Sequence, residues 1–256
     1  MKTTIRLFLL FLLSWRSTAD AVWGGESVRY NEAPYVFGFR GDLQCSATAL
    51  NDRVLLTAAH CLEGSRSVRS LEFTRGANGS VSTYRDIRVA DILLHPKYRI
   101  GFSSSPRTDE VQYDLALIIL KDPLSESFSK VDSFPALAMT NVTAELEGLK
   151  FYGLGRYSRR EVFGRKRKIE VSATYLSKLD IYKVKALKKN TGVCLGDSGG
   201  GLLRNNVITA VSSVRTEGVD CGSAENSAYM TPVGSHYCWI IKQIGKTDSQ
   251  CEKRTL

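Results

Sequence analysis

The stretch Gly196-Asp197-Ser198-Gly199-Gly200 decides how the rest of this chain is interpreted. Glycines on both sides favour a tight turn that presents the Ser198 hydroxyl as a nucleophile. That hydroxyl is weakly reactive at neutral pH, so it needs a histidine base, and the histidine needs a carboxylate to fix its tautomer. Two upstream stretches supply these groups, Thr57-Ala58-Ala59-His60-Cys61 and Asp114-Leu115-Ala116-Leu117. The chain therefore offers all three groups, in the order His, Asp, Ser.

These three stretches resemble the trypsin/chymotrypsin-like serine proteases, and the resemblance runs from Val22 to about Ile244. It implies that Ser198 attacks the substrate carbonyl, that His60 is the general base and that Asp114 orients the imidazole. It also implies an oxyanion hole formed by the backbone N–H groups of Gly196 and Ser198. The implied activity is that of a serine endopeptidase, which hydrolyses peptide bonds through an acyl-enzyme with no cofactor and no metal.

The Gly-x-Ser-x-Gly pattern around Ser198 also matches the nucleophile elbow of α/β-hydrolases. That fold requires the acid and the histidine to follow the serine. Downstream of Ser198 only Asp220 and His236 could serve, and they leave little room for the strands and helices between them. The order and the spacing therefore argue against this alternative.

The resemblance predicts an all-β fold of two six-stranded antiparallel β-barrels packed side by side, with a C-terminal α-helix. The barrels are expected at about residues 22–124 and 133–256, joined by the polar segment 125–129, so that residues 22–256 form one protease domain. Short apolar segments separated by Gly, Asn and Ser agree with such a fold. Near the C-terminal end, apolar side chains recur at intervals of three and four, as on one face of a helix. These side chains are Val233, Tyr237, Ile240, Ile241 and Ile244.

Residues 1–21 have the features of a secretory signal peptide. Lys2 and Arg6 precede the apolar run Leu7–Leu13, and Ala19-Asp20-Ala21 fits a cleavage site. The apolar run is too short to span a bilayer. We therefore expect a protein without a membrane span, secreted or exported to a periplasm.

All six cysteines follow the predicted signal peptide, and an even number in an exported protein favours disulfides. The family resemblance implies the pairs Cys45–Cys61 and Cys194–Cys221. Cys238 and Cys251 are then paired by elimination. A zinc site is the weaker alternative, because no two cysteines have the Cys-x-x-Cys spacing.

The stretch Val22-Trp23-Gly24-Gly25 resembles the mature N-terminus of the family, although Trp23 replaces the usual small aliphatic residue. The resemblance implies an ion pair between the Val22 α-amino group and Asp197 that shapes the oxyanion hole. No basic residue precedes Val22. Either signal cleavage after Ala21 creates this terminus directly, or cleavage after Ala19 leaves a dipeptide to be removed.

By position in the family, six residues are expected to line the pocket for the side chain that precedes the cut bond. Gly192 stands where trypsin-like members carry an aspartate, and Val214 is expected to narrow the mouth. We therefore predict an uncharged pocket that prefers small or medium apolar side chains. The six residues are Gly192, Val193, Leu195, Ser212, Val214 and Ser227.

The formal net charge of the chain is +9, and two basic segments contribute much of it. One extends from Arg156 to Lys168 and the other from Lys183 to Lys189. Both fit solvated loops, or surfaces that attract acidic substrates or polyanions. No aromatic-basic module accompanies them, so nucleic acid is not an expected partner. We expect a monomer that acts on proteins or peptides. The alternative function is a proteolytically idle homologue that binds partners through its basic loops.

Overall fold

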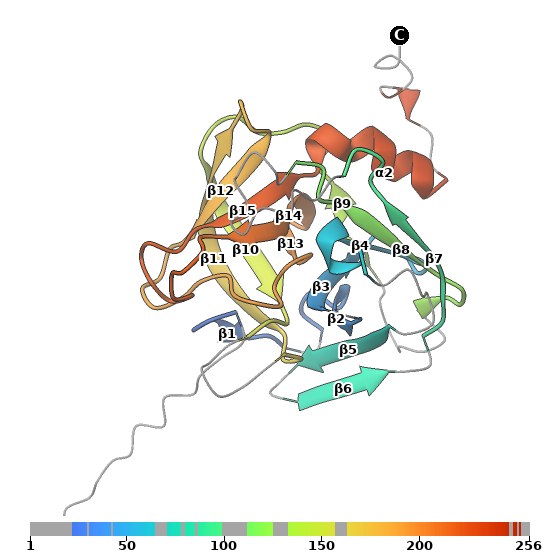
Figure 1. Cartoon of the computed structure of the whole chain (residues 1–256), viewed down its shortest axis with the longest axis horizontal. Coiled ribbons are helices and arrows are strands. Elements are labelled where there is room, and N and C mark those ends of the chain that lie inside the picture. Colours follow the sequence, from blue (N-terminus) through green and yellow to red (C-terminus); the bar gives the residue numbers. More distant parts are fainter. Residues whose placement is uncertain are drawn as a thin grey trace, which may run out of the picture.

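The computed structural model describes residues 22–29, 31–41, 43–64, 71–77, 80–84, 87–98, 112–124, 133–156, 163–245, 248, 249 and 251. Within these ranges, regular structure consists of two β-sheets, two short 3-10 helices and the helix α2 (Tyr237–Gln243). Figure 1 shows the two sheets beside one another, with α2 near the C-terminal end.

The first sheet carries the strands between residues 36 and 120. Its spatial order in the described residues is β6-β5-β2-β3-β4-β8-β7, and every neighbouring pair is antiparallel. The strands are β2 (Val36–Arg40), β3 (Gln44–Ala49), β4 (Val54–Thr57), β5 (Glu72–Ala77), β6 (Ser80–Tyr84), β7 (Val89–Leu94) and β8 (Ala116–Leu120).

The second sheet closes on itself. Six strands form the ring β10-β13-β14-β15-β12-β11, because β11 pairs with both β10 and β12. Two short strands are added outside this ring: β1 pairs with β11, and β9 pairs with β14 in parallel. The strands are β1 (Glu26–Ser27), β9 (Ala136–Leu137), β10 (Leu146–Gly153), β11 (Arg167–Leu176), β12 (Ile181–Ala186), β13 (Gly201–Arg204), β14 (Val207–Arg215) and β15 (Ala228–Pro232).

Side-chain alternation shows which face of the second sheet lies inside its barrel. Along β11, Ile169, Val171 and Ala173 are buried, whereas the residues between them are partly or fully exposed. Successive side chains on a strand point to opposite faces, so this pattern places one face of β11 inside the barrel. There these side chains belong to the same buried apolar cluster as Leu149 and Phe151 of β10.

The two barrels share a core at their junction. Leu203 and Val211 of the second sheet belong to the same buried apolar cluster as the first-barrel strands. Val233 and Ile240, from the C-terminal segment that the sequence predicted as helical, join that cluster and are fully buried. Helix α2 therefore fastens the end of the chain onto the first barrel.

The expected all-β double-barrel fold with a C-terminal helix is confirmed. Two details differ from the simple expectation. The first sheet has seven strands in its described part, and β1 pairs with the second sheet although it lies near the N-terminal end (Figure 1). The predicted linker 125–129 and the signal peptide lie outside the described residues. No helix in the described part is long and apolar enough to span a membrane.

Three disulfides join the six cysteines: Cys45–Cys61, Cys194–Cys221 and Cys238–Cys251. These pairs are the ones expected from the sequence. The first lies beside His60, the second beside the Ser198 turn, and the third ties α2 to the C-terminal segment. Each therefore restrains a part of the chain that carries either the site or the end of the fold.

Two buried histidines, His95 and His236, pack against each other beside helix α2. The rings of His95 and His236 are 4.9 Å apart, and His95 also contacts Tyr113 and Trp239. Burial is the main cause that lowers the pKa of both histidines to about 4, and the Lys97 ammonium contributes to both, as the His236 ring does for His95. For His236, the Asp180 carboxylate opposes this effect. Both rings are therefore neutral at pH 7.

We expect this histidine pair to make the fold sensitive to acid. Each folded-state pKa lies below the ordinary value near 6.5, so the unfolded chain binds more protons between about pH 4 and pH 6.5. The stabilisation is complete above this window and is lost as the pH falls through it, by on the order of 1–3 kcal/mol for each ring. Urea unfolding at pH 7 and pH 4.5 should show a smaller acid loss for His236→Phe than for the unchanged chain. An equal loss in both proteins would contradict this account.

Candidate functional site

His60 and Asp114 meet because two strands of the first sheet pair with each other. His60 lies on the 3-10 helix Ala59–Cys61 just after β4, and Asp114 lies just before β8. The β4–β8 register, Thr57 opposite Ala116, brings these two ends together. The Asp114 carboxylate accepts two hydrogen bonds from His60, one from its backbone N–H at 2.9 Å and one from Nδ1 at 2.7 Å. The second bond places the proton on Nδ1 and leaves Nε2 free to act as a base.

The second barrel supplies two serines to the same place. The Ser213 hydroxyl donates a hydrogen bond to Asp114 Oδ2, and the Ser213 carbonyl accepts one from the Ser198 hydroxyl at 3.2 Å. The Ser198 carbonyl in turn accepts a bond from the Ser46 N–H of the first barrel at 2.7 Å. The structure thus brings the three expected residues together, although in the described residues the Ser198 hydroxyl bonds to Ser213 rather than to His60.

Ser213 was not among the residues singled out from the sequence, which favoured its neighbour Ser212. Ser212 is buried, and its backbone pairs with Gly199 and Gly200 of the Ser198 turn. The β14–β15 register shifts between Ser212 and Val214. Such a bulge turns the next side chain towards a different face, and the apolar pattern of the strand gives no sign of it.

The electrostatics of this network favour an ion pair. Burial disfavours the imidazolium form of His60, but the attraction and hydrogen bond of the Asp114 carboxylate outweigh it, so the pKa of His60 is raised. Burial would raise the pKa of Asp114, but His60 and the Ser213 hydroxyl outweigh that effect and lower it. Asp114 is therefore ionised and can stabilise a proton on His60.

The Ser198 turn is held by a buried carboxylate. Asp197 is fully buried, and it accepts hydrogen bonds from the N–H groups of Gly155 at 2.9 Å and Cys194 at 2.8 Å. Burial raises the pKa of Asp197 to about 7, and the two backbone bonds oppose this rise. Gly196 and Gly199 have φ angles of +88° and +81°, which glycine adopts without strain. The residues on either side of Ser198 therefore fix the direction in which its hydroxyl points.

Val22 is buried within the apolar cluster of the second barrel. The next residue, Trp23, forms an isolated β-bridge with Gly192, and its carbonyl accepts the Gly192 N–H at 2.9 Å. The N-terminal segment therefore lies beside the expected substrate pocket. In the full chain the Val22 nitrogen belongs to a peptide bond, so it carries no ammonium charge for Asp197.

The expected pocket residues come from three neighbouring segments. Gly192 packs so tightly that an added Cβ would collide with the Cys221 carbonyl. Asn226 donates hydrogen bonds to the carbonyls of Val193 at 3.1 Å and Cys221 at 2.9 Å. Ser227 is buried, and its carbonyl accepts the Thr216 N–H. These contacts tie the segments around residues 192–198, 213–216 and 226–228 to one another.

Arg215 and Asn226 are further residues of this region that the sequence analysis did not assign. Arg215 ends β14 opposite Ala228, and Nη1 donates to the carbonyls of Thr216 at 3.1 Å and Val219 at 2.6 Å. A cation therefore lies beside the pocket segment. The chain contains many basic residues, and the sequence alone does not distinguish Arg215 from a solvated arginine.

His60 and Ser198 open onto a cavity of about 450 Å3. Leu43 and Leu195, which line it, are 49% and 57% exposed. Leu195, one of the six expected pocket residues, therefore lies at the cavity that His60 and Ser198 share. The complete lining consists of Leu43, Gln44, Cys45, His60, Arg156, Phe163, Leu195, Gly196 and Ser198.

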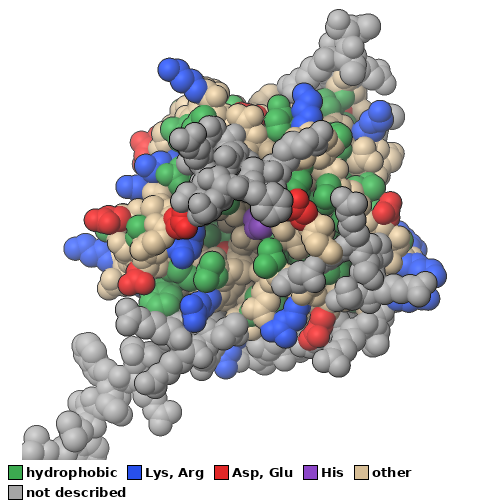
Figure 2. Space-filling view, viewed as in Figure 1, with side chains coloured by type: hydrophobic (Ala, Val, Ile, Leu, Met, Phe, Trp, Pro, Cys, Tyr) green, Lys and Arg blue, Asp and Glu red, His purple; other side chains and the backbone are tan. Residues whose placement is uncertain are grey.

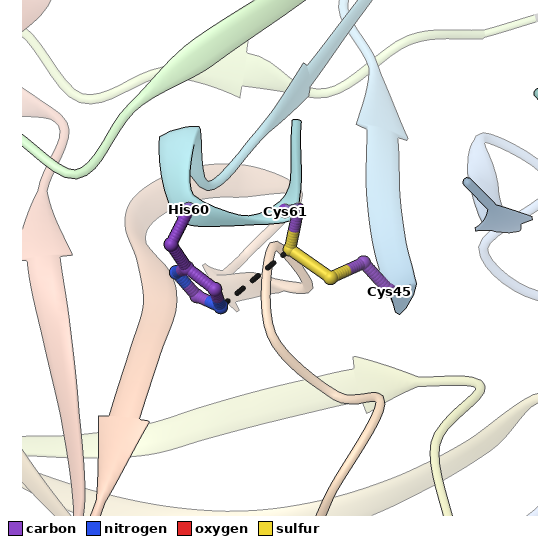
Figure 3. Close-up of side chains that lie close together, drawn as sticks. All are labelled: Cys45, His60 and Cys61. Carbon is purple, nitrogen blue, oxygen red and sulfur yellow. Dashed lines mark hydrogen bonds between the residues drawn. A yellow bond between two sulfur atoms is a disulfide. The ribbon is translucent and has the colours of Figure 1, made fainter. Parts of the chain in front are cut away.

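Cys45, which lines this cavity, forms a disulfide with Cys61 beside His60. Figure 3 shows the His60 ring next to it, with Nε2 3.7 Å from the Cys61 sulfur. The three side chains lie close enough to suggest a metal site, but both sulfurs are consumed in the disulfide. They therefore cannot act as the thiolates that a metal would need.

The first basic segment differs from the exposed loop that the sequence suggested. Lys166 and Arg167 are buried, and the Lys166 ammonium donates to the carbonyls of Glu32 at 2.8 Å and Ala33 at 2.7 Å. Burial lowers the pKa of Lys166 to about 7. Lys168 forms an ion pair with Glu32 at 2.7 Å. This part of the segment serves the packing of β11, whereas Arg159 and Arg160 lie outside the described residues.

Comparisons with known proteins agree with this geometry. The chain is 28% identical to Kallikrein-8 of Rattus norvegicus, with 97% of each chain covered. It is 26% identical to Snake venom serine protease KN11 of Trimeresurus stejnegeri, with 98% of each covered. It is 23% identical to Neutrophil elastase of Mus musculus, over 93% of this chain and 88% of that protein. The family model Trypsin matches residues 22–240, and the chain therefore belongs to the trypsin family of serine proteases.

Proposed function

We propose that this chain is a secreted, monomeric serine endopeptidase that cleaves proteins or peptides through His60, Asp114 and Ser198. The observation that carries the proposal is the hydrogen-bond network in which Asp114 holds His60 and Ser213, while Ser198 opens onto the same cavity as His60. This arrangement supplies a nucleophile, a base and a group that orients the base. The kallikrein, venom and elastase relatives support the same reaction class.

The proposed reaction begins with a rotation of the Ser198 side chain. Its hydroxyl now donates to the Ser213 carbonyl, and a turn about the Cα–Cβ bond would direct it to Nε2 of His60. His60 takes the proton as Ser198 Oγ attacks the substrate carbonyl, and it later returns the proton to the leaving amine. Water then attacks the acyl-enzyme, with His60 again as the base. Asp114 stabilises the imidazolium at each stage, which agrees with the raised pKa of His60.

The developing oxyanion would be held by the N–H groups of Gly196 and Ser198. Within the described residues, neither N–H donates to a protein acceptor, and both residues line the cavity at His60. Two donors left without a partner at the reaction centre can bind the transition state without first breaking other bonds.

Replacement of the nucleophile tests the reaction. Ser198→Ala should remove nearly all peptidase activity, while oxyanion stabilisation and substrate binding leave a residual rate roughly 10³–10⁴ above that in water. A fluorophosphonate should label the unchanged protein at Ser198, and it should also label Ser177→Ala, which alters an exposed serine elsewhere. A folded, processed chain that neither cleaves peptides nor takes the label would favour the idle, binding-protein alternative.

Specificity offers a second test. We propose that the pocket prefers small or medium apolar side chains, since Gly192 brings no charge and Arg215 places a cation nearby. Peptides with Ala or Val before the cut bond should exceed those with Lys or Arg in kcat/KM by about 10- to 200-fold. Arg215→Ala should narrow that difference by removing the repulsion. A preference of the unchanged enzyme for Lys or Arg would refute the pocket assignment.

Activation offers a third test. We propose that cleavage before Val22 frees an ammonium group that pairs with the buried Asp197 carboxylate. Loss of one partner of a buried ion pair costs about 3–5 kcal/mol. Asp197→Asn should therefore cripple kcat/KM, whereas Asp91→Asn, at an exposed site, should not. N-terminal sequencing of the active protein should begin at Val22, and a fully active form that begins upstream would defeat the mechanism.

A further inference from the structure

A second cavity lies behind the expected substrate pocket, on the second barrel. Its volume is about 330 Å3, within the range typical of small-molecule sites. Two segments enclose it: the end of β12 with the turn that follows it, residues 185–191, and the loop 222–226 before β15.

The charge of this cavity is one-sided. Lys185, Lys188 and Lys189 line it and are exposed, and its described lining contains no acidic side chain, although the exposed Glu225 belongs to the enclosing loop. A neighbouring cavity shares Leu187, Lys188 and Thr191 with it and is lined in addition by Glu26 and Glu170. Figure 2 shows Lys and Arg side chains interspersed with acidic ones over the face in view. Three exposed lysines around one hollow give it a local excess of positive charge.

The turn that carries these lysines is held in place. The Thr191 hydroxyl donates to the Lys188 carbonyl at 2.7 Å, and the Leu187 N–H donates to the Glu170 carbonyl at 3.0 Å. Backbone held by such bonds keeps the lysine positions close together before any ligand arrives. Less ordering is then needed on binding, which favours affinity.

The inner wall adds a polar group that is not anionic. Asn226 is only 7% exposed and lines the cavity, and its amide nitrogen is engaged by the carbonyls of Val193 and Cys221. Its Oδ1 atom is buried and accepts no hydrogen bond within the described residues. This atom is enclosed within the protein, so the Asn226 side chain closes the inner wall of the cavity and ties it to the carbonyls of Val193 and Cys221.

We propose that this cavity, which we call the lysine cavity, binds a sulfated sugar unit of a polysaccharide. Sulfate groups match the three ammonium groups, and sugar hydroxyls match the polar side chains of Asn190, Thr191 and Ser223 in the lining. Single-stranded nucleic acid is a poorer match, because the described lining has no aromatic side chain on which bases could stack. A lipid surface is a poorer match because the lysines surround a hollow, and Leu187 is the one exposed large apolar side chain in its lining.

The test is a binding measurement that does not depend on catalysis. The protein carries Ser198→Ala to prevent self-digestion, and titration calorimetry measures its affinity for a heparin dodecasaccharide. Lys185→Gln, Lys188→Gln and Lys189→Gln together should weaken binding roughly tenfold or more and should reduce its salt dependence. The matched control changes three exposed lysines elsewhere, Lys150→Gln, Lys178→Gln and Lys242→Gln, and should leave the affinity nearly unchanged.

Further binding measurements test whether the ligand is recognised through its sulfate groups. Replacing the same three lysines with arginine should retain binding, which would show that the charge and not the fold had been lost. A hyaluronan dodecasaccharide, which has carboxylates but no sulfates, should bind much more weakly. Equal losses in the two triple glutamine variants would overturn the proposal, as would equal binding of hyaluronan. Tighter binding to phosphatidylserine vesicles with the same lysine dependence would overturn it in favour of a membrane surface.

Discussion

The rest of this structure depends on the hydrogen bonds of one buried carboxylate, Asp114. A carboxylate removed from water must be satisfied by donors or neutralised, since an isolated buried charge is prohibitively costly. Here the donors are the backbone and ring of His60 and the hydroxyl of Ser213. His60 belongs to the first barrel and Ser213 to the second. The same bonds that make the charge tolerable therefore also fix how the two barrels meet.

The Ser198 turn, which belongs to the second barrel, is likewise held by close packing and by a buried carboxylate. Gly199 lies so close to Thr57 and Ser46 of the first barrel that an added Cβ would collide with both. Asp197 is buried under the turn and holds it through two backbone N–H groups. Close backbone packing and a buried acid thus act together. The nucleophile is therefore positioned both by its neighbours in the turn and by the packing of that turn against the first barrel.

The sequence predicted the fold, and it singled out three residues that the structure brings together, because their signals are local. Glycines around Ser198 and apolar residues after Asp114 mark a turn and a strand regardless of what surrounds them. The contacts of Ser213 and Lys166 could not be predicted from such local signals. Ser213 reaches Asp114 through a bulge, and Lys166 is buried by carbonyls more than a hundred residues away in the chain. Both facts depend on long-range packing, which leaves no periodic trace in the sequence. Arg215 and Asn226 were missed for the same reason.

Because β1 pairs with the second sheet and α2 packs on the first barrel, each end of the described chain is fastened to the barrel farther from it in sequence. Strand β1 and helix α2 therefore both link the two barrels, β1 from the N-terminal side and α2 from the C-terminal side. The first barrel can pack against Val233 and Ile240 only after the strands of the second barrel have been synthesised. On the proposed function, Ser198 and Ser213 would likewise join His60 and Asp114 only when most of the second barrel has been made.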